Sequence, residues 1–291
     1  MSQLSDRVRT EIISAIDSDK LLLPTLPEVA LQVREVAEDP NASVDKLVKT
    51  IGHDASLTVR IIKVANSPLL RASRQIDDLK MALMRLGMEF TCNLATGLAM
   101  EQMFQATSDM VDKRLRDVWS HSSEVAGICH VLCRHHSNLK ADKATLAGLV
   151  HKIGVLPILT YAEDHPSLLR DSMTLDTVIE ELHPIIGEKI LKTWDFPEEL
   201  LNVPSQYSKF TREIETADYA DIVCVAMLQS YMGTDHPMGR VDYATVKSFT
   251  RLGLDSDMQS ADAEDLSEEM AAATSLLMQD SDTAEKTTAR M

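Results

Sequence analysis

The sequence is poor in the residues that mark several common classes of protein. Only 10 of its 291 residues are glycine, and it has no Gly-x-Gly-x-x-Gly, P-loop or Gly-x-Ser-x-Gly motif. This argues against a glycine-rich loop that cradles phosphate groups and against a serine-hydrolase elbow. Aromatic residues make up 4% of the chain, and long alternating runs of valine, isoleucine and threonine are absent, so strands are not expected.

Long apolar runs are also missing. No stretch approaches the roughly 18–20 apolar residues of a membrane span. The N-terminal residues are mixed in charge and lack the unbroken apolar core of a signal peptide. We therefore expect neither a membrane-spanning segment nor a secretory leader.

Positive charge is in deficit as well. The chain has 29 Lys and Arg against 45 Asp and Glu, for a formal net charge of −16. This balance argues against nucleic acid or an anionic membrane as the main partner, because both bind basic surfaces. Residues 254–291 hold ten acidic and two basic residues, so half of the negative excess lies in this tail.

The chain has four cysteines, and their spacing does not suggest a disulfide framework. Cys129 and Cys133 are four residues apart within one helical pattern and point the same way, which is poor disulfide geometry. No second cysteine pair follows to complete a tetrahedral zinc site. We interpret them as small buried hydrophobic residues and predict a reducing, cytoplasmic location.

What is present is helical periodicity along most of the chain, which predicts an all-α fold of about a dozen helices. Ser43 and Asp54 are suited to cap the N-termini of two early helices, and Gly87 is suited to end another. Later helices are expected at the ranges 142–150, 184–191 and 219–231.

Changes in composition divide the chain into three predicted parts: residues 1–110, 111–253 and 254–291. In the last part, apolar residues at helical spacing predict an amphipathic helix over 260–278, with 279–291 disordered. We favour docking of this helix on the body of the protein. The alternative is a segment that binds a partner.

Three histidines far apart in sequence are the main candidates for chemistry. His121, His151 and His183 each lie in or beside a predicted helix. In a helical bundle such residues can converge on a metal ion. Taken singly, such a residue is more often a buried histidine that has its hydrogen bonds satisfied.

Several motifs in a fixed order resemble the HDOD domain family. Residues 23–30 read LPTLPEVA, residues 39–43 read DPNAS, and residues 54–58 read DASLT. WSHS at 119–122 and AGLVHKIG at 147–154 continue the series. The resemblance covers roughly residues 20–250, and the order of the motifs makes it far more specific than any one of them.

The resemblance implies an all-helical, two-lobed fold with a C-terminal lobe like that of the HD and HD-GYP metal-dependent phosphohydrolases. It also implies a role in bacterial signalling. That role would be regulatory rather than hydrolytic, because most members of the family lack the full catalytic set of these relatives. In the catalytic relatives a His-Asp pair helps to hold one or two divalent ions, which activate water and bind phosphate.

This sequence departs from the catalytic pattern at two places. The pair reads His151-Lys152, and a lysine ammonium has no acceptor and repels a metal ion. The His-His pair that catalytic relatives carry beyond the tryptophan motif is absent, since residues 204–209 read PSQYSK. We therefore predict a degenerate cleft, whose residues are His121, His151, Lys152, His183, Asp218 and Asp221.

Lys152 is predicted to pair with Asp218 or Asp221. The expected function is non-catalytic regulation, without cofactor, through a signalling protein partner or a nucleotide-like ligand. The alternative is a metal-dependent phosphohydrolase with altered ligands, in which His121, His151, His183 and Asp221 hold a divalent ion such as Mn, Fe or Mg.

Overall fold

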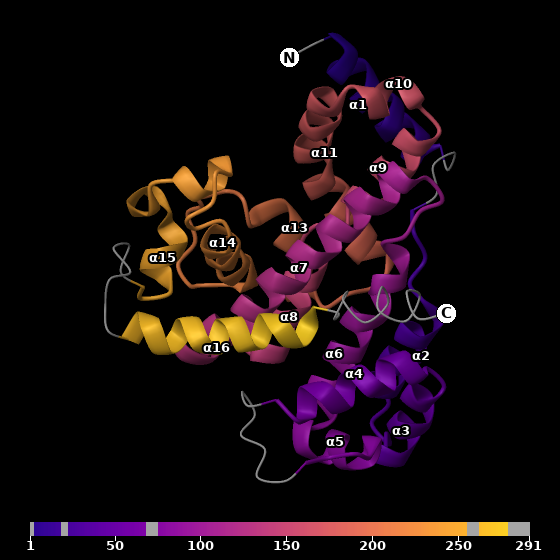
Figure 1. Cartoon of the computed structure of the whole chain (residues 1–291), viewed down its shortest axis with the longest axis vertical. Helices are drawn as coiled ribbons and strands as arrows, with labels where there is room; N and C mark the ends of the chain where they lie inside the picture. Colours follow the sequence, from indigo (N-terminus) through magenta and orange to yellow (C-terminus); the bar gives the residue numbers. More distant parts are fainter. Residues whose placement is uncertain (1–2, 19–22, 68–74, 255–261, 279–291) are drawn as a thin grey trace, which may run out of the picture.

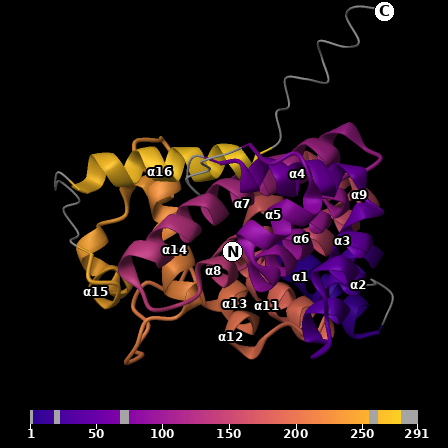
Figure 2. The same ribbon diagram turned by 90° about the horizontal axis from the view of Figure 1, so that it is seen from below.

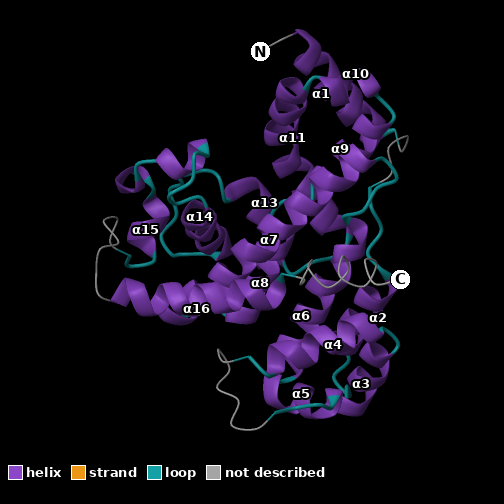
Figure 3. Ribbon diagram, in the orientation of Figure 1, coloured by secondary structure: helices purple, strands orange, loops and turns teal. Residues whose placement is uncertain are grey.

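The structure is a computed structural model that describes residues 3–18, 23–67, 75–254 and 262–278. Every regular element among these residues is a helix, and the described part of the chain has no strand (Figure 3). The predicted all-α fold is confirmed.

The helices fall into two groups along the chain. The helical elements before residue 108 are α1 (Gln3–Asp17), α2 (Glu28–Glu38), α3 (Val44–Gly52), α4 (Ala55–Ala65), α5 (Leu79–Leu86), α6 (Met88–Ala99) and the 3₁₀ turn η2 (Met100–Met103). Those that follow are α7 (Asp109–His136), α8 (Ala141–Val150), α9 (Val155–Glu163), α10 (Pro166–Arg170), α11 (Ser172–Thr193), α12 (Glu198–Leu201), α13 (Val203–Gln206), α14 (Tyr219–Ser230), η3 (Pro237–Arg240), η4 (Tyr243–Thr245), α15 (Lys247–Arg251) and α16 (Asp262–Leu277).

The helix ends follow local sequence signals. The Ser43 hydroxyl accepts a hydrogen bond from Lys46 N, and the Asp54 carboxylate accepts one from Leu57 N, so both predicted N-caps are confirmed. Gly87 ends α5 with φ of 83°, a conformation that glycine adopts without the steric cost of a Cβ.

One predicted boundary is wrong. A helix was expected to begin at Pro184, but α11 begins at Ser172 and continues through that proline. Proline lacks an N–H group and costs helix stability in the interior. Burial of Leu175, Val178 and Leu182 before the proline, and of Ile186 after it, packs one long face of α11 and outweighs that cost.

The elements before residue 108 do not all pack together. Helices α2 to α6 form a small bundle, and α6 also packs against α8. By contrast, α1 packs against α11, at the opposite end of the molecule from α2 to α5 (Figure 1). The predicted domain boundary at residue 110 stays a prediction. Helix α1 precedes this boundary in the sequence but packs on α11, which follows it.

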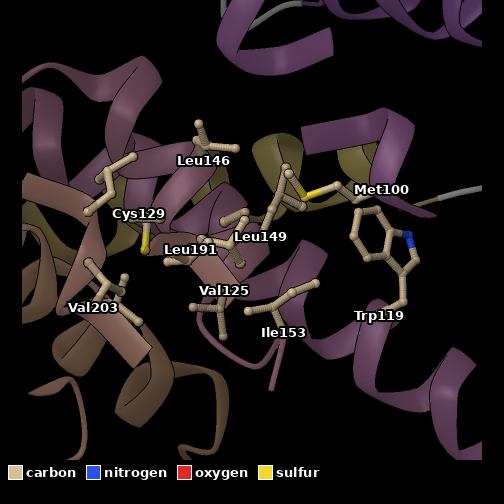
Figure 4. Close-up of a cluster of buried hydrophobic side chains, with 14 of the residues drawn as sticks. Met100, Trp119, Val125, Cys129, Leu146, Leu149, Ile153, Leu191 and Val203 are labelled. Atoms are coloured by element: carbon tan, nitrogen blue, oxygen red, sulfur yellow. The ribbon is translucent and has the colours of Figure 1, made fainter. Parts of the chain in front are cut away.

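The long helix α7 forms the centre of the second group. Helices α8 and α14 pack on it, and Val125 and Cys129 of α7 meet Leu146 and Leu149 of α8 in the core (Figure 4). The crossing of α7 and α8 is close, because a Cβ on Gly148 would lie 2.5 Å from Ala126 Cα. All four cysteines are free and buried, and the predicted burial of Cys129 and Cys133 is confirmed.

The last helix docks on the body, as we favoured from the sequence. Helix α16 lies along α7 (Figure 2), and a Cβ on Gly127 would lie 2.6 Å from Thr274 N. Arg60 of α4 donates to the carbonyl of Leu277, so the end of α16 is also tied to the N-terminal bundle. The predicted disorder of residues 279–291 falls outside the described residues.

The expectation that no stretch could span a membrane by length and composition is corrected. Within the described residues, Ala141–Glu163 passes that test, but 83% of its most apolar window is buried inside the protein. This stretch comprises α8, a turn and α9, and it is a core segment whose apolar side chains pack against other helices.

Candidate functional site

The centre of the candidate site is the turn between α8 and α9, which carries the sequence His151-Lys152-Ile153-Gly154. His151 is fully buried, and its Nδ1 donates to the carbonyl of Gly148 at 2.6 Å. Since a carbonyl only accepts, this bond places the proton on Nδ1 and leaves Nε2 with a lone pair. In the described part of the chain Nε2 has no hydrogen-bond partner.

A contact between two glycines brings α11 to this turn. A Cβ on Gly154 would lie 2.1 Å from the carbonyl oxygen of His183 and 2.6 Å from Gly187 N. Only a residue without a side chain permits this approach, and the approach places His183 opposite His151.

The structure brings the three predicted histidines together. The ring centroids of His121 and His151 are 6.1 Å apart, and Tyr207 fills the space between His151 and His183. Its ring meets His151 edge-on with centroids 4.9 Å apart, and its hydroxyl lies 3.3 Å from Nε2 of His183. His121 Nε2 lies 3.0 Å from the hydroxyl of Ser230, at the end of α14.

Lys152 supplies the positive charge of the cluster. Its Nζ lies 3.5 Å from Nδ1 of His121. Among the residues that the structure describes, no carboxylate oxygen lies within 4.0 Å of Nζ. Burial lowers the pKa of the Lys152 ammonium to about 8, although the negative charge of Glu180 opposes this shift.

The histidines are held neutral. Burial, reinforced by the charge of Lys152, lowers the pKa of His121 and of His183 to about 3. The same two causes lower the pKa of His151 well below its ordinary value. At neutral pH the cluster therefore consists of three uncharged imidazoles beside one ammonium group.

The structure does not bring Asp218 or Asp221 to this cluster. Asp221 is fully buried and accepts two bonds from Arg251, at 2.6 and 2.9 Å, and one from Ser248 at 2.7 Å. Asp218 caps α14 and pairs with Arg212 at 2.7 Å.

The predicted pairing of Lys152 with either aspartate is therefore corrected. His121 contacts α14 at Ser230, nine residues beyond Asp221, which is about 13 Å along a helix. Both aspartates lie at the other end of α14, where arginines neutralise them.

The side chains at this site do not fit the divalent ion that the alternative function, a metal-dependent phosphohydrolase, requires. Manganese, iron and magnesium sites use carboxylate oxygens, alone or with imidazoles. Here the fourth expected ligand, Asp221, is bound to Arg251, and the Lys152 ammonium lies 3.5 Å from His121 Nδ1. No group of three or more histidine, cysteine or acidic side chains suited to a metal occurs among the described residues.

The cluster opens to a cleft of about 830 Å³, within the usual size range of small-molecule sites. Its wall includes Lys152, His183, Tyr207, Glu180, Tyr231 and His236. At its edge Arg114 pairs with Asp176 at 2.6 Å.

Sequence reasoning missed four of these residues: Glu180, Tyr207, Tyr231 and His236. The segment 204–209 was noted only for its lack of histidine. Its tyrosine was the available signal, since a bulky apolar ring is suited to fill a site that has lost its ligands.

Replacement of Gly154 by alanine is expected to lower the free energy of unfolding by about 1–3 kcal/mol, as overpacking does elsewhere. The new Cβ would meet backbone atoms of α11, which cannot move aside as a flexible side chain can. Urea denaturation measures the effect. Gly52→Ala is the matched control, because its Cβ would enter open space. Equal stability of the two variants would show that the contact is not close.

The chain is similar to a known domain family and to several solved structures. The family model of the HDOD domain matches residues 23–210. The structure of a candidate metal-dependent phosphohydrolase from Shewanella amazonensis SB2B is 29% identical, with a TM-score of 0.82 over 94% of this chain and 99% of that one. An HDOD domain protein of unknown function from Geobacter sulfurreducens is 19% identical, with a TM-score of 0.64 over 94% and 98% of the two chains.

Two further similarities are more distant. A candidate signal transduction protein from Marinobacter aquaeolei VT8 is 22% identical, with a TM-score of 0.66 over 94% of this chain and 66% of that one. An uncharacterized protein of Treponema pallidum (strain Nichols) is 22% identical over 194 residues. That match covers 62% of this chain and 36% of the relative, so the chain spans about a third of the length of this curated relative.

Proposed function

The chain belongs to the HDOD domain family, and on that premise we propose that it is a non-catalytic regulatory protein of bacterial signal transduction. It acts by binding a signalling protein or a small nucleotide-like ligand. It works in the cytoplasm and needs no metal cofactor.

The observation that carries this proposal is the arrangement around Lys152. An ammonium group stands beside His121, where a metal-binding cleft needs a carboxylate. The buried ring of Tyr207 packs against His151 and reaches His183. Repulsion by the ammonium and the space taken by the phenol both act against an ion held by the three histidines.

The name of the Marinobacter protein, a candidate signal transduction protein, agrees with this role. The name of the Shewanella protein favours the second candidate function, a metal-dependent phosphohydrolase with altered ligands. That candidate requires the three histidines to bind an ion without Asp221.

Elemental analysis and an activity assay separate the two functions. We expect the protein purified from cells grown with added manganese and iron to hold less than stoichiometric Mn, Fe or Zn, because the Lys152 ammonium lies beside His121 and the Tyr207 ring packs against His151. We also expect no turnover of bis-p-nitrophenyl phosphate with added Mn²⁺.

His151→Ala is the matched variant for this assay. Stoichiometric metal together with turnover, both lost in His151→Ala, would establish the hydrolase and overturn the proposed function. Trace turnover that His151→Ala retains would come from a contaminant and would leave the non-catalytic function standing.

A further inference from the structure

The ammonium group of Lys152 lies in the wall of the cleft and has more hydrogen-bond donors than its contact with His121 uses. It has three N–H bonds, and His121 Nδ1 at 3.5 Å takes at most one of them. Glu180 attracts Lys152 electrostatically but makes no ion pair with it within 4.0 Å. Arg114 already neutralises Asp176 at the edge of the cleft. An anion that enters the cleft would therefore find an available counter-charge.

A second group in the same wall also lacks a partner. His183 is 6% exposed, and its Nδ1 has no hydrogen-bond partner in the described part of the chain. Since buried polar atoms are normally paired, this nitrogen leaves one hydrogen-bonding position open beside the cleft.

The wall of the same cleft also offers a flat aromatic surface. Tyr231 stacks on His121 with centroids 4.7 Å apart, and His236 stacks on Tyr231 with centroids 3.8 Å apart and ring planes within 10°. His236 is exposed at the outer end of this stack. Such a surface is suited to a planar ring, because base-on-aromatic stacking is favourable for every base.

We propose that the cleft binds a nucleoside monophosphate, with its phosphate on the Lys152 ammonium and its base on the outer face of His236, at the end of the stack that His236 forms with Tyr231. This inference rests on the proposed function, since a metal centre in the cleft would itself take the phosphate. The lysine that replaces the metal-binding carboxylate thus becomes the anchor of a sensory site. Nothing is hydrolysed there, and the bound nucleotide is released unchanged.

Isothermal titration of the full chain with AMP and with GMP tests the proposal. We expect Lys152→Met to weaken binding at least tenfold, because it removes the charged hydrogen-bond donor that meets the phosphate. His236→Ala should weaken binding about fivefold or more through lost stacking. Lys80→Met, on α5 in the N-terminal bundle, is the control and should bind like the parent.

Titrations with adenosine and with inorganic phosphate separate the two parts of the ligand. Both should bind more weakly than AMP. Adenosine binding equal to that of AMP would overturn the phosphate anchor, and phosphate binding equal to that of AMP would overturn the aromatic surface. A Lys152→Met protein that melts cooperatively and binds AMP as the parent does would overturn the whole site.

Chromatography of the titrated nucleotide keeps this proposal apart from the proposed function. If AMP is recovered intact but no nucleotide binds, the ligand site falls and the non-catalytic function stands. If AMP is hydrolysed by the metal-loaded protein, the non-catalytic function falls, whether or not Lys152 contributes to binding.

Discussion

Replacement of Asp221 by asparagine is expected to lower the free energy of unfolding by about 3–5 kcal/mol, the usual cost of breaking a buried ion pair from one side. The Asp221 side chain is 1% exposed and that of Arg251 is 10% exposed. Asparagine would leave the Arg251 guanidinium buried without its counter-charge. It would also weaken the tie between α14 and α15, which Ser248 and Arg251 make together.

Urea denaturation of the parent and of Asp221→Asn measures this effect. Asp218→Asn is the matched control, because the Asp218 side chain is 32% exposed and asparagine caps a helix about as well as aspartate. Its partner Arg212 keeps Asp221 at 3.7 Å as a counter-charge. We expect the control to cost less than about 1 kcal/mol. An Asp221→Asn protein as stable as the parent would contradict this structural role.

The effect of Asp221 should depend on pH in a definite direction. Burial alone would raise the pKa of its carboxyl, but bonds from Arg251 and Ser248 outweigh burial and lower it below 3.8. A carboxyl whose folded-state pKa is lowered stabilises the protein above its unfolded pKa. The difference between parent and variant should be complete above pH 4 or so and should shrink as the pH falls further.

Replacement of Lys152 by methionine is expected to stabilise the protein at pH 7 by about 1–3 kcal/mol. The shift of its pKa from 10.5 to about 8 corresponds to a cost of about 3 kcal/mol for holding the ammonium in the folded state. Methionine has a similar length and no charge, so it removes this cost. Loss of the weak contact with His121 Nδ1 offsets part of the gain.

The pH dependence of this gain follows from the same shift. Below about pH 8 the lysine is charged in both the folded and the unfolded state, so the full cost is present. Between about pH 8 and 10.5 the folded protein releases the proton first, and the parent gains stability. The advantage of Lys152→Met should therefore decline over that range.

Thermal and urea denaturation from pH 7 to pH 10.5 test this expectation, with Lys152→Arg as the control that keeps the charge. We expect no gain from arginine. A Lys152→Met protein less stable than the parent at pH 7 would contradict it, and would mean that Lys152 has an ion pair like the one predicted with Asp218 or Asp221. The stability of Lys152→Met also ensures that any loss of nucleotide binding is not a loss of fold.

Much of the local structure could be predicted from the sequence. Ser43 and Asp54 cap the helices that they were expected to cap, because an N-cap needs only a side chain two or three residues from the amide it accepts. The periodicity of apolar residues predicted helices throughout and the docking of α16. The positions of His121, His151 and His183 in or beside predicted helices brought them into one hypothesis before their distances were known.

The predictions that failed depended on contacts between distant segments. Pro184 stands inside α11 because buried residues on both sides of it pack along one continuous face. Asp221 was predicted as an alternative metal ligand, but its carboxylate pairs with Arg251, thirty residues later in the sequence. Helical periodicity predicts which face of a helix is buried, and it does not predict the helix or the side chain that covers that face.

The sequence by itself determined that the chain is helical, where several of its helices begin, and that the position after His151 carries a positive charge in place of a carboxylate. These are properties of a residue and its near neighbours. Only the tertiary structure decided that Lys152 faces a cleft without a carboxylate in contact and that Tyr207 fills the space between two histidines. It also decided that Asp218 and Asp221 form ion pairs with arginines. Those outcomes depend on how closely α9 approaches α11 at Gly154 and on which end of α14 meets His121, and packing over the whole chain sets both.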